Sequence, residues 1–431
     1  MSAAASPEQA SALDQGDELG ALRARFALPR DPQGAPLIYL CGHSLGLAPL
    51  AARERVLEEL ADWERLGVQG HEHARRAWVG YAEQFAPALA ALAGARTTEV
   101  VAMNSLSVNL HLLLASFYRP AGARVRILIE AGAFPSDRHV VESQLRWHGL
   151  DPASALVELA PRAGEELLRA ADIDARIAEE GARLALVLWP GVQYRTGQAF
   201  DLPAIAHAAR RAGASVGFDL AHAIGNLPLA LHDSGADFAA WCSYKYLNGG
   251  PGAIGGAFVH ERHARDEALP RLAGWWGSNP ATRFRMSGRF ELTPGAAGWQ
   301  LSNPPVLAAA PLLAALEIFE AAGIARLRAK SVRLTAFLAA ALSRCCGEQV
   351  QLITPAEPEQ RGCQLSIRVR GGSERAARGH ATLGRRGVVS DWREPDTIRL
   401  APAPLYNSYQ DAWRAAEQLG AVLAEAGPGP P

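Results

Sequence analysis

The chain has few cysteines, and their spacing does not suit a metal centre or a disulfide framework. Five are present, without a CxxC motif: Cys41, Cys242, Cys345, Cys346 and Cys363. Structural zinc sites and small secreted folds use paired cysteines, so we expect neither, and a reducing cytoplasm fits better. His71-Glu72-His73 brings two imidazoles together. Without a third ligand nearby, we expect no metal there.

The chain also lacks an excess of charge and a long apolar run. Its 43 basic and 44 acidic residues give a net charge of −1, which gives no reason to expect nucleic acid or acidic membranes as partners. The longest apolar stretch, 306–316, is too short to span a bilayer. Residues 1–26 carry acidic side chains before their first apolar run, unlike a signal peptide. We therefore expect a soluble cytoplasmic protein.

Short apolar segments alternate with amphipathic ones through the middle of the chain. The predicted strands are 99–103, 125–129, 184–189, 214–218, 238–242 and 256–259, with helices at 53–66, 108–118 and 202–212. Nearly continuous apolar strands separated by helices are typical of a parallel sheet covered on both faces. The pattern therefore predicts an α/β fold with a mostly parallel sheet in a large domain.

The last third of the chain has a different pattern, which predicts a smaller α+β domain. Its predicted helices are 308–322, 324–342 and 410–424, and its predicted strands are 350–353, 364–369, 387–389 and 397–400. Residues 1–30 are predicted to form a loosely held arm with one helix, followed by a strand at 37–40. The resulting division is 1–70 for the arm and part of the small domain, 71–310 for the large domain and 311–431 for the small α+β domain.

Lys245 has an unusual setting for a lysine. It lies between Tyr244 and Tyr246, and a Gly-Gly-Pro-Gly segment follows shortly after. An apolar site disfavours the charged ammonium and leaves the amine able to attack a carbonyl. Upstream, Asp219 and His222 follow the apolar strand predicted before them. A carboxylate ending a strand, with a lysine in an aromatic and glycine-rich loop, predicts a pyridoxal phosphate site; a lysine that only reaches to solvent is the alternative.

Other segments could serve the same cofactor, and each has a structural alternative. Asp219 could keep a pyridine nitrogen protonated or cap the next turn. Ser105 or Ser107, between a strand and a helix, could cradle a phosphate or act as an N-cap. Phe134 could stack on a planar ring or pack within its loop. Arg399, in an apolar strand, could bind a substrate carboxylate or form a buried salt bridge.

Taken together, these segments closely resemble the kynureninase family of pyridoxal phosphate enzymes. The matching stretches run in order from about residue 36 to 410: 42–46, 103–111, 134–137, 191–198, 217–226, 243–248, 274–277, 302–305 and 399–407. The resemblance implies fold type I, the architecture of aspartate aminotransferase, and a homodimer with active sites built from both subunits. It also implies hydrolytic cleavage of the Cβ–Cγ bond of kynurenine or 3-hydroxykynurenine. The products would be an anthranilate and alanine, in tryptophan catabolism or NAD biosynthesis.

The resemblance also implies roles for individual residues. Lys245 would bind the cofactor covalently and move the α-proton, Asp219 would face the pyridine nitrogen, and Tyr244 would bind phosphate and exchange a proton at the substrate carbonyl. The other implied cofactor contacts are Leu106, Ser107, Phe134, Pro135, Ser136, Asp137 and His222, with Trp275 and Asn303 of the partner subunit. The implied substrate contacts are Arg399 at the α-carboxylate and His71, Ser302 and Asn303 around the aryl ring. These polar groups favour the 3-hydroxylated substrate, with activity expected on both.

Two positions depart from the family pattern. His43 stands where asparagine is usual, and Pro190 stands where serine or threonine is frequent. The first could alter the substrate entrance, and the second removes a possible hydroxyl contact.

Two rival functions are compatible with such a cofactor. A cysteine desulfurase-like lyase would need a reactive cysteine on a mobile loop, but Cys363 reads as the beginning of a strand. A non-catalytic cofactor-binding protein would not need Tyr244, Lys245, Asp219 and Arg399 together.

Overall fold

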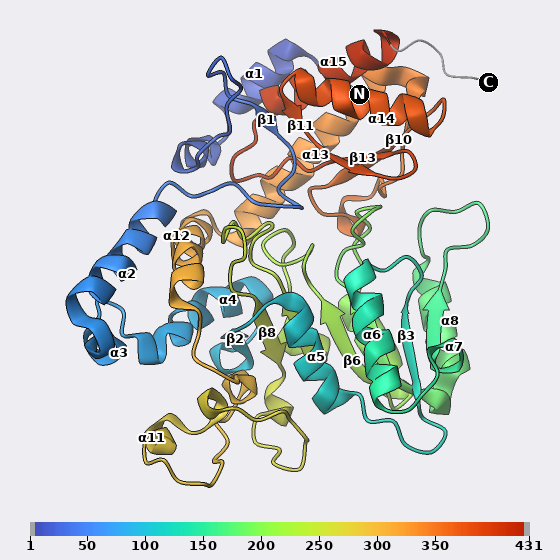
Figure 1. The fold of residues 1–431 in the computed structure, drawn as a ribbon. Helices are drawn as coiled ribbons and strands as arrows, with labels where there is room; N and C mark the ends of the chain where they lie inside the picture. The colour runs from blue at the N-terminus through green and yellow to red at the C-terminus, as the bar shows by residue number, and fades with distance from the viewer. Residues whose placement is uncertain (1–4, 426–431) are drawn as a thin grey trace.

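The computed structural model describes residues 5–425, which form two bodies joined at a seam (Figure 1). The lower body in Figure 1 is built on a seven-stranded sheet, and the upper body carries a four-stranded one. The first helix of the chain lies in the upper body among the last ones, so both ends of the described chain meet there.

The large sheet has the order β2-β8-β7-β6-β5-β3-β4. Its strands are β2 (Val100–Ala102), β3 (Arg126–Glu130), β4 (Leu156–Leu159), β5 (Leu184–Pro190), β6 (Ser215–Asp219), β7 (Phe238–Trp241) and β8 (Gly256–Val259). Within this sheet only β8 is antiparallel to its neighbours, and the others all point the same way. The predicted mostly parallel sheet is confirmed, and the carboxyl ends of its parallel strands share one edge.

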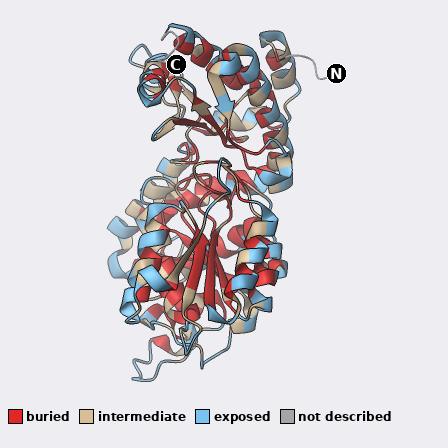
Figure 2. Cartoon of the chain, turned by 90° about the vertical axis from the view of Figure 1, so that its right-hand side faces the viewer, coloured by how far each residue is buried: buried red, intermediate tan, exposed pale blue. Residues whose placement is uncertain are grey.

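Alternate residues of the strands feed two apolar clusters, one on each face of the sheet. In β3, Ile127 and Ile129 join the cluster of α5 (Leu106–Phe117) and α6 (Pro135–Trp147), whereas Leu128 joins that of α8 (Ala170–Glu180) and α9 (Leu202–Arg211). Figure 2 shows these buried strands between two helical layers with exposed outer faces. Each large aliphatic side chain buried in this way stabilises the fold by roughly 2 kcal/mol.

Local sequence fixes where the covering helices begin and end. Asp201 accepts a hydrogen bond from the backbone N–H of Ala204 at 3.0 Å and so caps α9. Pro203, in the first turn, has no N–H that would be left unpaired. After α9, Gly213 adopts a φ of +72°, a conformation that favours glycine, and the chain turns back into β6.

The upper body is the smaller α+β unit. Its antiparallel sheet contains β9 (Val350–Leu352), β10 (Leu365–Val369), β12 (Asp391–Arg393) and β13 (Thr397–Leu400), in the order β12-β13-β10-β9. The helices α1 (Pro7–Gln15), α13 (Ile324–Cys346), α14 (Ser373–Arg385) and α15 (Tyr409–Glu425) pack around it. A separate parallel pair joins β1 (Ile38–Tyr39) to β11 (Val388–Val389). The predicted smaller α+β unit is confirmed.

The expectation of a loosely held amino-terminal arm is wrong. Ala10 of α1 is fully buried, and the Asp14 carboxylate accepts hydrogen bonds from the first two amides of α15, at 2.7 and 3.1 Å. Asp17 forms a buried ion pair with Lys330 at 2.7 Å. The arm is held because it supplies the cap of a helix that lies almost 400 residues away in sequence.

Several further elements were not predicted or extend beyond their predicted limits. The remaining helices are α2 (Ala52–Leu66), α3 (Gly70–His73), α4 (Ala86–Ala93), α7 (Pro152–Ala155), α10 (Leu231–Ser234), α11 (Pro280–Arg283) and α12 (Val306–Ala322). The elements without a counterpart among the predictions are the helices α3, α4, α6, α7, α8, α10, α11 and α14 and the strands β4 and β12. Over the described residues no single helix combines the length and apolarity of a membrane span; the pair 306–322 and 324–349 meets both criteria only when joined across an 80° bend.

Candidate active site

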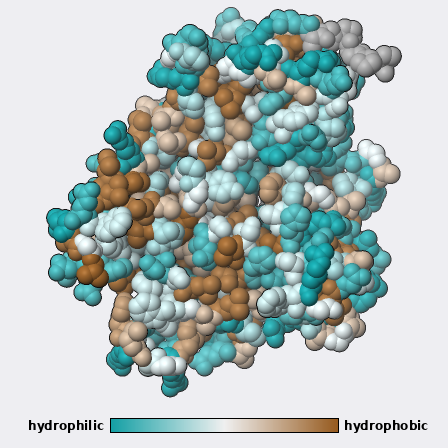
Figure 3. Space-filling model, in the orientation of Figure 1, coloured by the Kyte–Doolittle hydropathy of each residue, from teal (hydrophilic) through white to brown (hydrophobic). Residues whose placement is uncertain are grey.

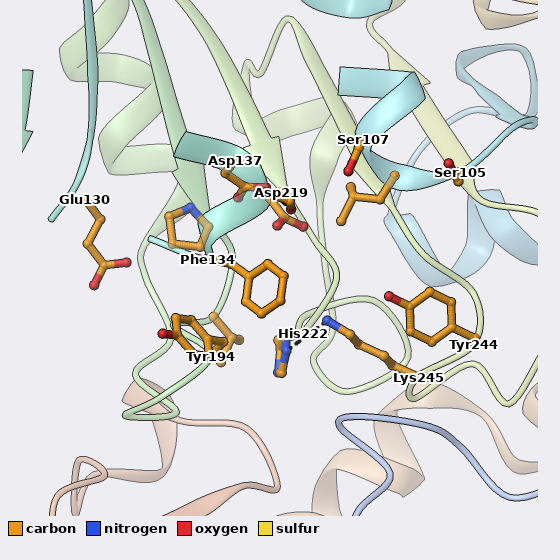
Figure 4. A pocket seen from close by; sticks show the side chains of 14 residues that line it. Ser105, Ser107, Glu130, Phe134, Asp137, Tyr194, Asp219, His222, Tyr244 and Lys245 are labelled. Carbon is orange, nitrogen blue, oxygen red and sulfur yellow. Dashed lines mark hydrogen bonds between the residues drawn. The ribbon is translucent and has the colours of Figure 1, made fainter. Parts of the chain in front are cut away.

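Residues at the shared edge of the parallel strands line a pocket of about 300 Å³ (Figure 4). Glu130 ends β3, Pro190 ends β5 and Asp219 ends β6, while Ser105 follows β2 and Lys245 follows β7. The other lining residues are Leu106, Ser107, Phe134, Ser136, Asp137, Val192, Tyr194, His222 and Tyr244. Open α/β sheets bind ligands at this edge. The structure therefore brings together most of the predicted cofactor contacts.

Lys245 is buried, with 8% of its surface exposed. Its Nζ lies 3.1 Å from Nε2 of His222, its one hydrogen-bond partner within residues 5–425. The same atom lies 5.6 Å from the ring centroid of Phe134 and 6.0 Å from that of Tyr244. Around it the chain leaves no room at Gly46, where a Cβ atom would lie 2.3 Å from the carbonyl oxygen of Lys245. This is a fixed amine in an aromatic site.

His222 has an unmet hydrogen-bond donor that faces the same pocket. Burial, and then the charge of Lys245, lower the pKa of His222 well below its usual value, so the ring is neutral. Because Nε2 lies against the Lys245 amine, we assign the ring proton to Nδ1. Nδ1 is buried and has no partner in the part of the chain that the structure describes. A buried N–H without a partner is rare in folded proteins and points to a ligand.

Two carboxyl groups, those of Asp137 and Asp219, lie together at one end of the pocket. Asp219 Oδ1 accepts a hydrogen bond from the backbone N–H of Ala221 at 2.7 Å, so the predicted capping alternative is also present. Burial, and then the charge of Asp219, raise the pKa of Asp137 well above its usual value. Asp137 therefore holds a proton beside the Asp219 carboxyl group.

The amino end of α5 forms another part of the pocket wall. Asn104 adopts a φ of +47° and turns the chain from β2 into the helix. Ser105 occupies the N-cap position, but its side chain makes no capping hydrogen bond. The first amides of an α-helix have no partner within the helix, and they attract anions such as phosphate. Leu106, Ser107 and Tyr244 flank this end, as the sequence predicted for a phosphate site.

Glu130 and Tyr194 line the pocket but were not predicted as site residues. Glu130 follows an apolar strand in the same way as Asp219, so the signal that identified Asp219 applied to it as well. Tyr194 lies in a loop without such a signal, and its ring meets that of Phe134 edge to face at 5.2 Å. Pro190 lines the pocket with its ring carbons. It offers no hydroxyl group, as expected from the departure from serine or threonine at this position.

Glu130 is expected to make stability depend on pH. Burial raises its pKa from 4.5 to about 8, so the folded protein keeps a proton that the unfolded chain loses. The stabilisation is complete below pH 4.5 and is lost as the pH rises through about 8, a total of at most about 5 kcal/mol. Glu130→Gln stays neutral. The thermal midpoint of Glu130→Gln minus that of wild type should therefore increase by several degrees between pH 5 and pH 9.

The control for this measurement is Glu158→Gln, which changes a half-buried glutamate on the neighbouring strand β4. Thermal midpoints of the three proteins are compared at saturating cofactor. A difference between wild type and Glu130→Gln that does not change with pH would contradict the expectation.

Arg399 is buried in β13 and does not line the lysine pocket. Its Nε donates to Oδ1 of Asp391 at 2.9 Å, and its Nη1 donates to the carbonyl oxygen of Tyr194 at 2.7 Å. Nη2 donates to Ser44 Oγ at 3.3 Å. The internal salt bridge, one of the two predicted alternatives, is therefore present. Asp391 was not predicted because it meets Arg399 only through the register of β12 on β13.

Besides Arg399, five predicted contacts do not line the lysine pocket of their own chain. His71, Trp275 and Asn303 line a second hollow of about 540 Å³, and Ser302 lies exposed beside them. Trp275 packs against the ring of Phe284 and is 49% exposed. Pro135 begins α6 behind the lining residues. Within one chain, the aryl pocket predicted from His71, Ser302 and Asn303 is not joined to Lys245.

The groups that line the lysine pocket fit pyridoxal phosphate. A buried amine without a carboxylate partner suits the aldehyde, and the Asp219 carboxyl group suits a protonated ring nitrogen. The uncapped start of α5 suits the phosphate, and the unmet N–H of His222 suits a polar ring substituent. Phe134 offers a flat apolar face beside the amine.

Comparisons with known proteins agree with this assignment. A family model described as the kynureninase C-terminal domain matches residues 327–419. A kynureninase of Xanthomonas campestris pv. campestris (strain B100) is 55% identical over 414 residues, which cover 96% of this chain and 97% of that protein. A kynureninase of Stenotrophomonas maltophilia (strain K279a) is 54% identical over 421 residues, 98% of this chain and 99% of that one.

Solved structures establish the fold. The cystine C-S lyase C-DES, in complex with its reaction product cysteine persulfide, has a TM-score of 0.74 at 20% identity, over 93% of this chain and all of that one. A cysteine desulfurase from Thermococcus onnurineus NA1 has a TM-score of 0.73 at 18% identity, over 90% of this chain and 95% of that one. The predicted fold type I architecture is thereby confirmed.

Proposed function

Because this chain belongs to the kynureninase family, we propose that it hydrolyses the Cβ–Cγ bond of L-kynurenine or 3-hydroxy-L-kynurenine. The products are anthranilate or 3-hydroxyanthranilate and L-alanine, in tryptophan catabolism. It is a pyridoxal phosphate-dependent hydrolase. The observation that carries the proposal is the buried Lys245 amine in one pocket with the carboxyl groups of Asp137 and Asp219, in a chain 55% identical to a kynureninase.

We assign some residues of the pocket to cofactor binding and others to proton transfer. When bound, pyridoxal phosphate supplies a ring that accepts electrons from the substrate carbon next to the amine. We assign the covalent attachment to Lys245, whose amine afterwards moves the α-proton. The charge of Asp219 keeps the ring nitrogen protonated. Ser107 and the first amides of α5 would hold the phosphate, and Phe134 would pack against the ring.

Tyr244 is the group that we assign to the substrate carbonyl. Burial raises the pKa of Tyr244 above its ordinary value, so the phenol keeps its proton and acts as a donor. Water adds to the γ-carbonyl of kynurenine, the Cβ–Cγ bond breaks, and the aryl acid leaves. The three-carbon fragment that remains takes up a proton and departs as alanine.

Cys363, the cysteine considered for a desulfurase activity, is not suited to that role. Cys363 is fully buried, and burial raises its pKa to about 12, so its thiolate is not formed at neutral pH. Its backbone N–H donates to Asn226 at 3.0 Å, which holds it at the beginning of β10. A thiol that is neither ionised nor accessible cannot accept sulfur from a substrate.

Turnover assays test the function directly. Purified protein with pyridoxal phosphate and kynurenine should give fluorescent anthranilate and an equal amount of alanine. Incubated with cysteine, it should release no sulfide above a cofactor blank. We also expect a higher kcat/KM for 3-hydroxykynurenine than for kynurenine. Sulfide from cysteine, without anthranilate from kynurenine, would refute the proposal.

We propose that the enzyme is a homodimer in which each active site contains residues of both subunits. Leu57, Trp63, Val68 and Phe284 are each more than half exposed, and Figure 3 shows apolar surface gathered on the side where α2 and α3 lie. Contiguous exposed apolar surface is typical of an interaction site. We propose that this side binds a second copy. The hollow of His71, Trp275 and Asn303 would then face the Lys245 pocket of the partner subunit.

Mixing of subunits tests the shared site. Lys245→Ala and Asn303→Arg should each be nearly inactive alone. Co-expressed in equal amounts, they should recover about a quarter of wild-type activity, because half of the dimers are hybrids with one intact site. The matched control pairs Lys245→Ala with Asp219→Asn, which lie in the same pocket of one chain, and should recover nothing. Equal recovery in both mixtures, or in neither, would contradict the shared site.

We further propose the domain division 1–70, 71–310 and 311–431. The apolar cluster of the upper body, with members from residues 5–40 and 334–423 of the described chain, supports joining both chain ends in the small domain. Leu47 and the buried apolar residues of 309–327 pack in the cluster of the large sheet, so the packing favours boundaries nearer 40 and 330. We also propose a cytoplasmic location, which is supported by five cysteines that all remain thiols in the described structure.

A further inference from the structure

The loop that follows β1 lies at the seam between the two bodies, beside the lysine pocket. At one end Ser44 Oγ donates to Oδ2 of Asp391 at 2.7 Å, the carboxylate that also holds Arg399. At the other end the backbone N–H of Gly46 donates to the carbonyl oxygen of Tyr244 at 2.8 Å. The loop is thus fixed between the buried arginine of the upper body and the lysine loop of the lower one.

His43, directly before Ser44 in this loop, is completely buried. Neither of its ring nitrogens has a hydrogen-bond partner among residues 5–425. The ring centroid lies 6.3 Å from that of His222, and one ring nitrogen lies within 4.8 Å of a carboxylate oxygen of Asp391. That carboxylate is already occupied by arginine and serine donors. Two unmet nitrogens on one buried side chain are unusual, and they indicate a partner from outside the chain.

The electrostatic surroundings of His43 indicate the charge of that partner. Burial, and then the charges of Arg399, Lys245 and Arg393, lower the pKa of His43 well below its usual value. The ring is therefore neutral, with one N–H donor. The charges that lower its pKa are positive, and the one carboxylate near the ring, that of Asp391, is already paired with Arg393 and Arg399. Such surroundings favour an anionic acceptor. They disfavour a metal cation, although the thiol of Cys41 lies within 4.8 Å of a ring nitrogen.

We propose that His43 binds the α-carboxylate of the amino-acid substrate by donating its ring N–H, next to Arg399. The proposal rests on the proposed function, which supplies an amino acid whose amine would take the place of the Lys245 amine in the pocket. An amino acid has its carboxylate one carbon away from its amine, and His43 lies on the seam between the lysine and the arginine. Because His43 and Arg399 are 0% and 1% exposed, the carboxylate reaches them when the two bodies part, and the seam then closes over it.

Ligands with and without a carboxylate test the assignment in the holoenzyme. His43→Leu removes both nitrogens at similar volume, and His43→Asn keeps one N–H donor. Dissociation constants are measured for L-alanine and L-alaninamide from the absorbance of the bound cofactor. We expect His43→Leu to bind alanine about tenfold more weakly, the loss of one hydrogen bond to a charged group. It should bind alaninamide within twofold of wild type, and His43→Asn should lose no more than about threefold for alanine.

Two further measurements separate a binding role from a structural one. The thermal midpoint of His43→Leu without ligand should not fall below that of wild type, because the variant leaves no unmet polar group. Its KM for kynurenine should rise while kcat stays within about threefold. Equal alanine affinity in wild type and His43→Leu would overturn the proposal, as would equal losses for alanine and alaninamide.

The proposed function and the role of His43 fail separately. The titration needs only an amino acid and the bound cofactor, whereas the proposed function is tested by kynurenine turnover of the wild type. If His43→Leu does not fold, His43→Met supplies a second apolar variant for the same two titrations.

Discussion

Lys245→Ala is expected to abolish both covalent cofactor attachment and turnover. Lys245 supplies the one amine in the pocket of the described structure, and its Nζ lies 3.1 Å from His222. Without it no residue of the pocket can hold the cofactor covalently or move the α-proton. We expect the visible absorbance of the attached cofactor to disappear and kcat/KM for kynurenine to fall by about 10⁴-fold or more. Absorbance spectra and anthranilate fluorescence measure the two effects.

Lys330→Ala is the matched control, because Lys330 is also a buried lysine. It pairs with Asp17 at 2.7 Å in the upper body, away from the pocket. Breaking a buried ion pair destabilises a protein by about 3–5 kcal/mol. The control should therefore unfold at a lower temperature while keeping the cofactor absorbance. Retained turnover in Lys245→Ala would remove the basis of the proposed mechanism.

Asp219→Asn is expected to be far more damaging than Asp137→Asn, although the two carboxyl groups lie together. Asp219 provides the negative charge that faces the ring nitrogen, and losing a buried charge partner costs about 4 kcal/mol, or about 10³-fold in kcat/KM. Asp137 already holds a proton, because burial and Asp219 raise its pKa. Its replacement by the neutral amide should lower kcat/KM by no more than about tenfold.

Steady-state kinetics with kynurenine measure this asymmetry, and cofactor content is checked by absorbance in both variants. Equal losses would mean that the proton does not reside on Asp137. A larger loss in Asp137→Asn would assign the charge that faces the ring nitrogen to Asp137 instead.

Much of the lysine pocket could be predicted because its residues follow strands. Asp219 and Lys245 come directly after apolar segments, and the carboxyl ends of parallel strands meet at one edge. Local sequence therefore placed these side chains near one another before any contact was known. Glu130 obeys the same rule and was missed only because it was read as the end of a strand and not as a functional group.

Contacts between distant segments could not be predicted in the same way. The partner of Arg399 is Asp391 because β12 and β13 pair in a particular register. The amino-terminal arm is fixed because Asp14 caps a helix that begins at residue 409. In both cases the decisive partner is chosen by packing in three dimensions, and no local pattern marks it.

The sequence by itself determined the parallel sheet, the pocket at its edge and the chemistry of Lys245 and Asp219, because strand periodicity and strand ends are local properties. Only the tertiary structure decided which groups are buried without a partner. It buries Cys363, which makes the thiol inert. It also buries His43 without a hydrogen-bond partner near Lys245 and Arg399, which makes this substituted loop residue a candidate ligand for an anion. The physical reason is that desolvation and the field of distant charges depend on the whole fold.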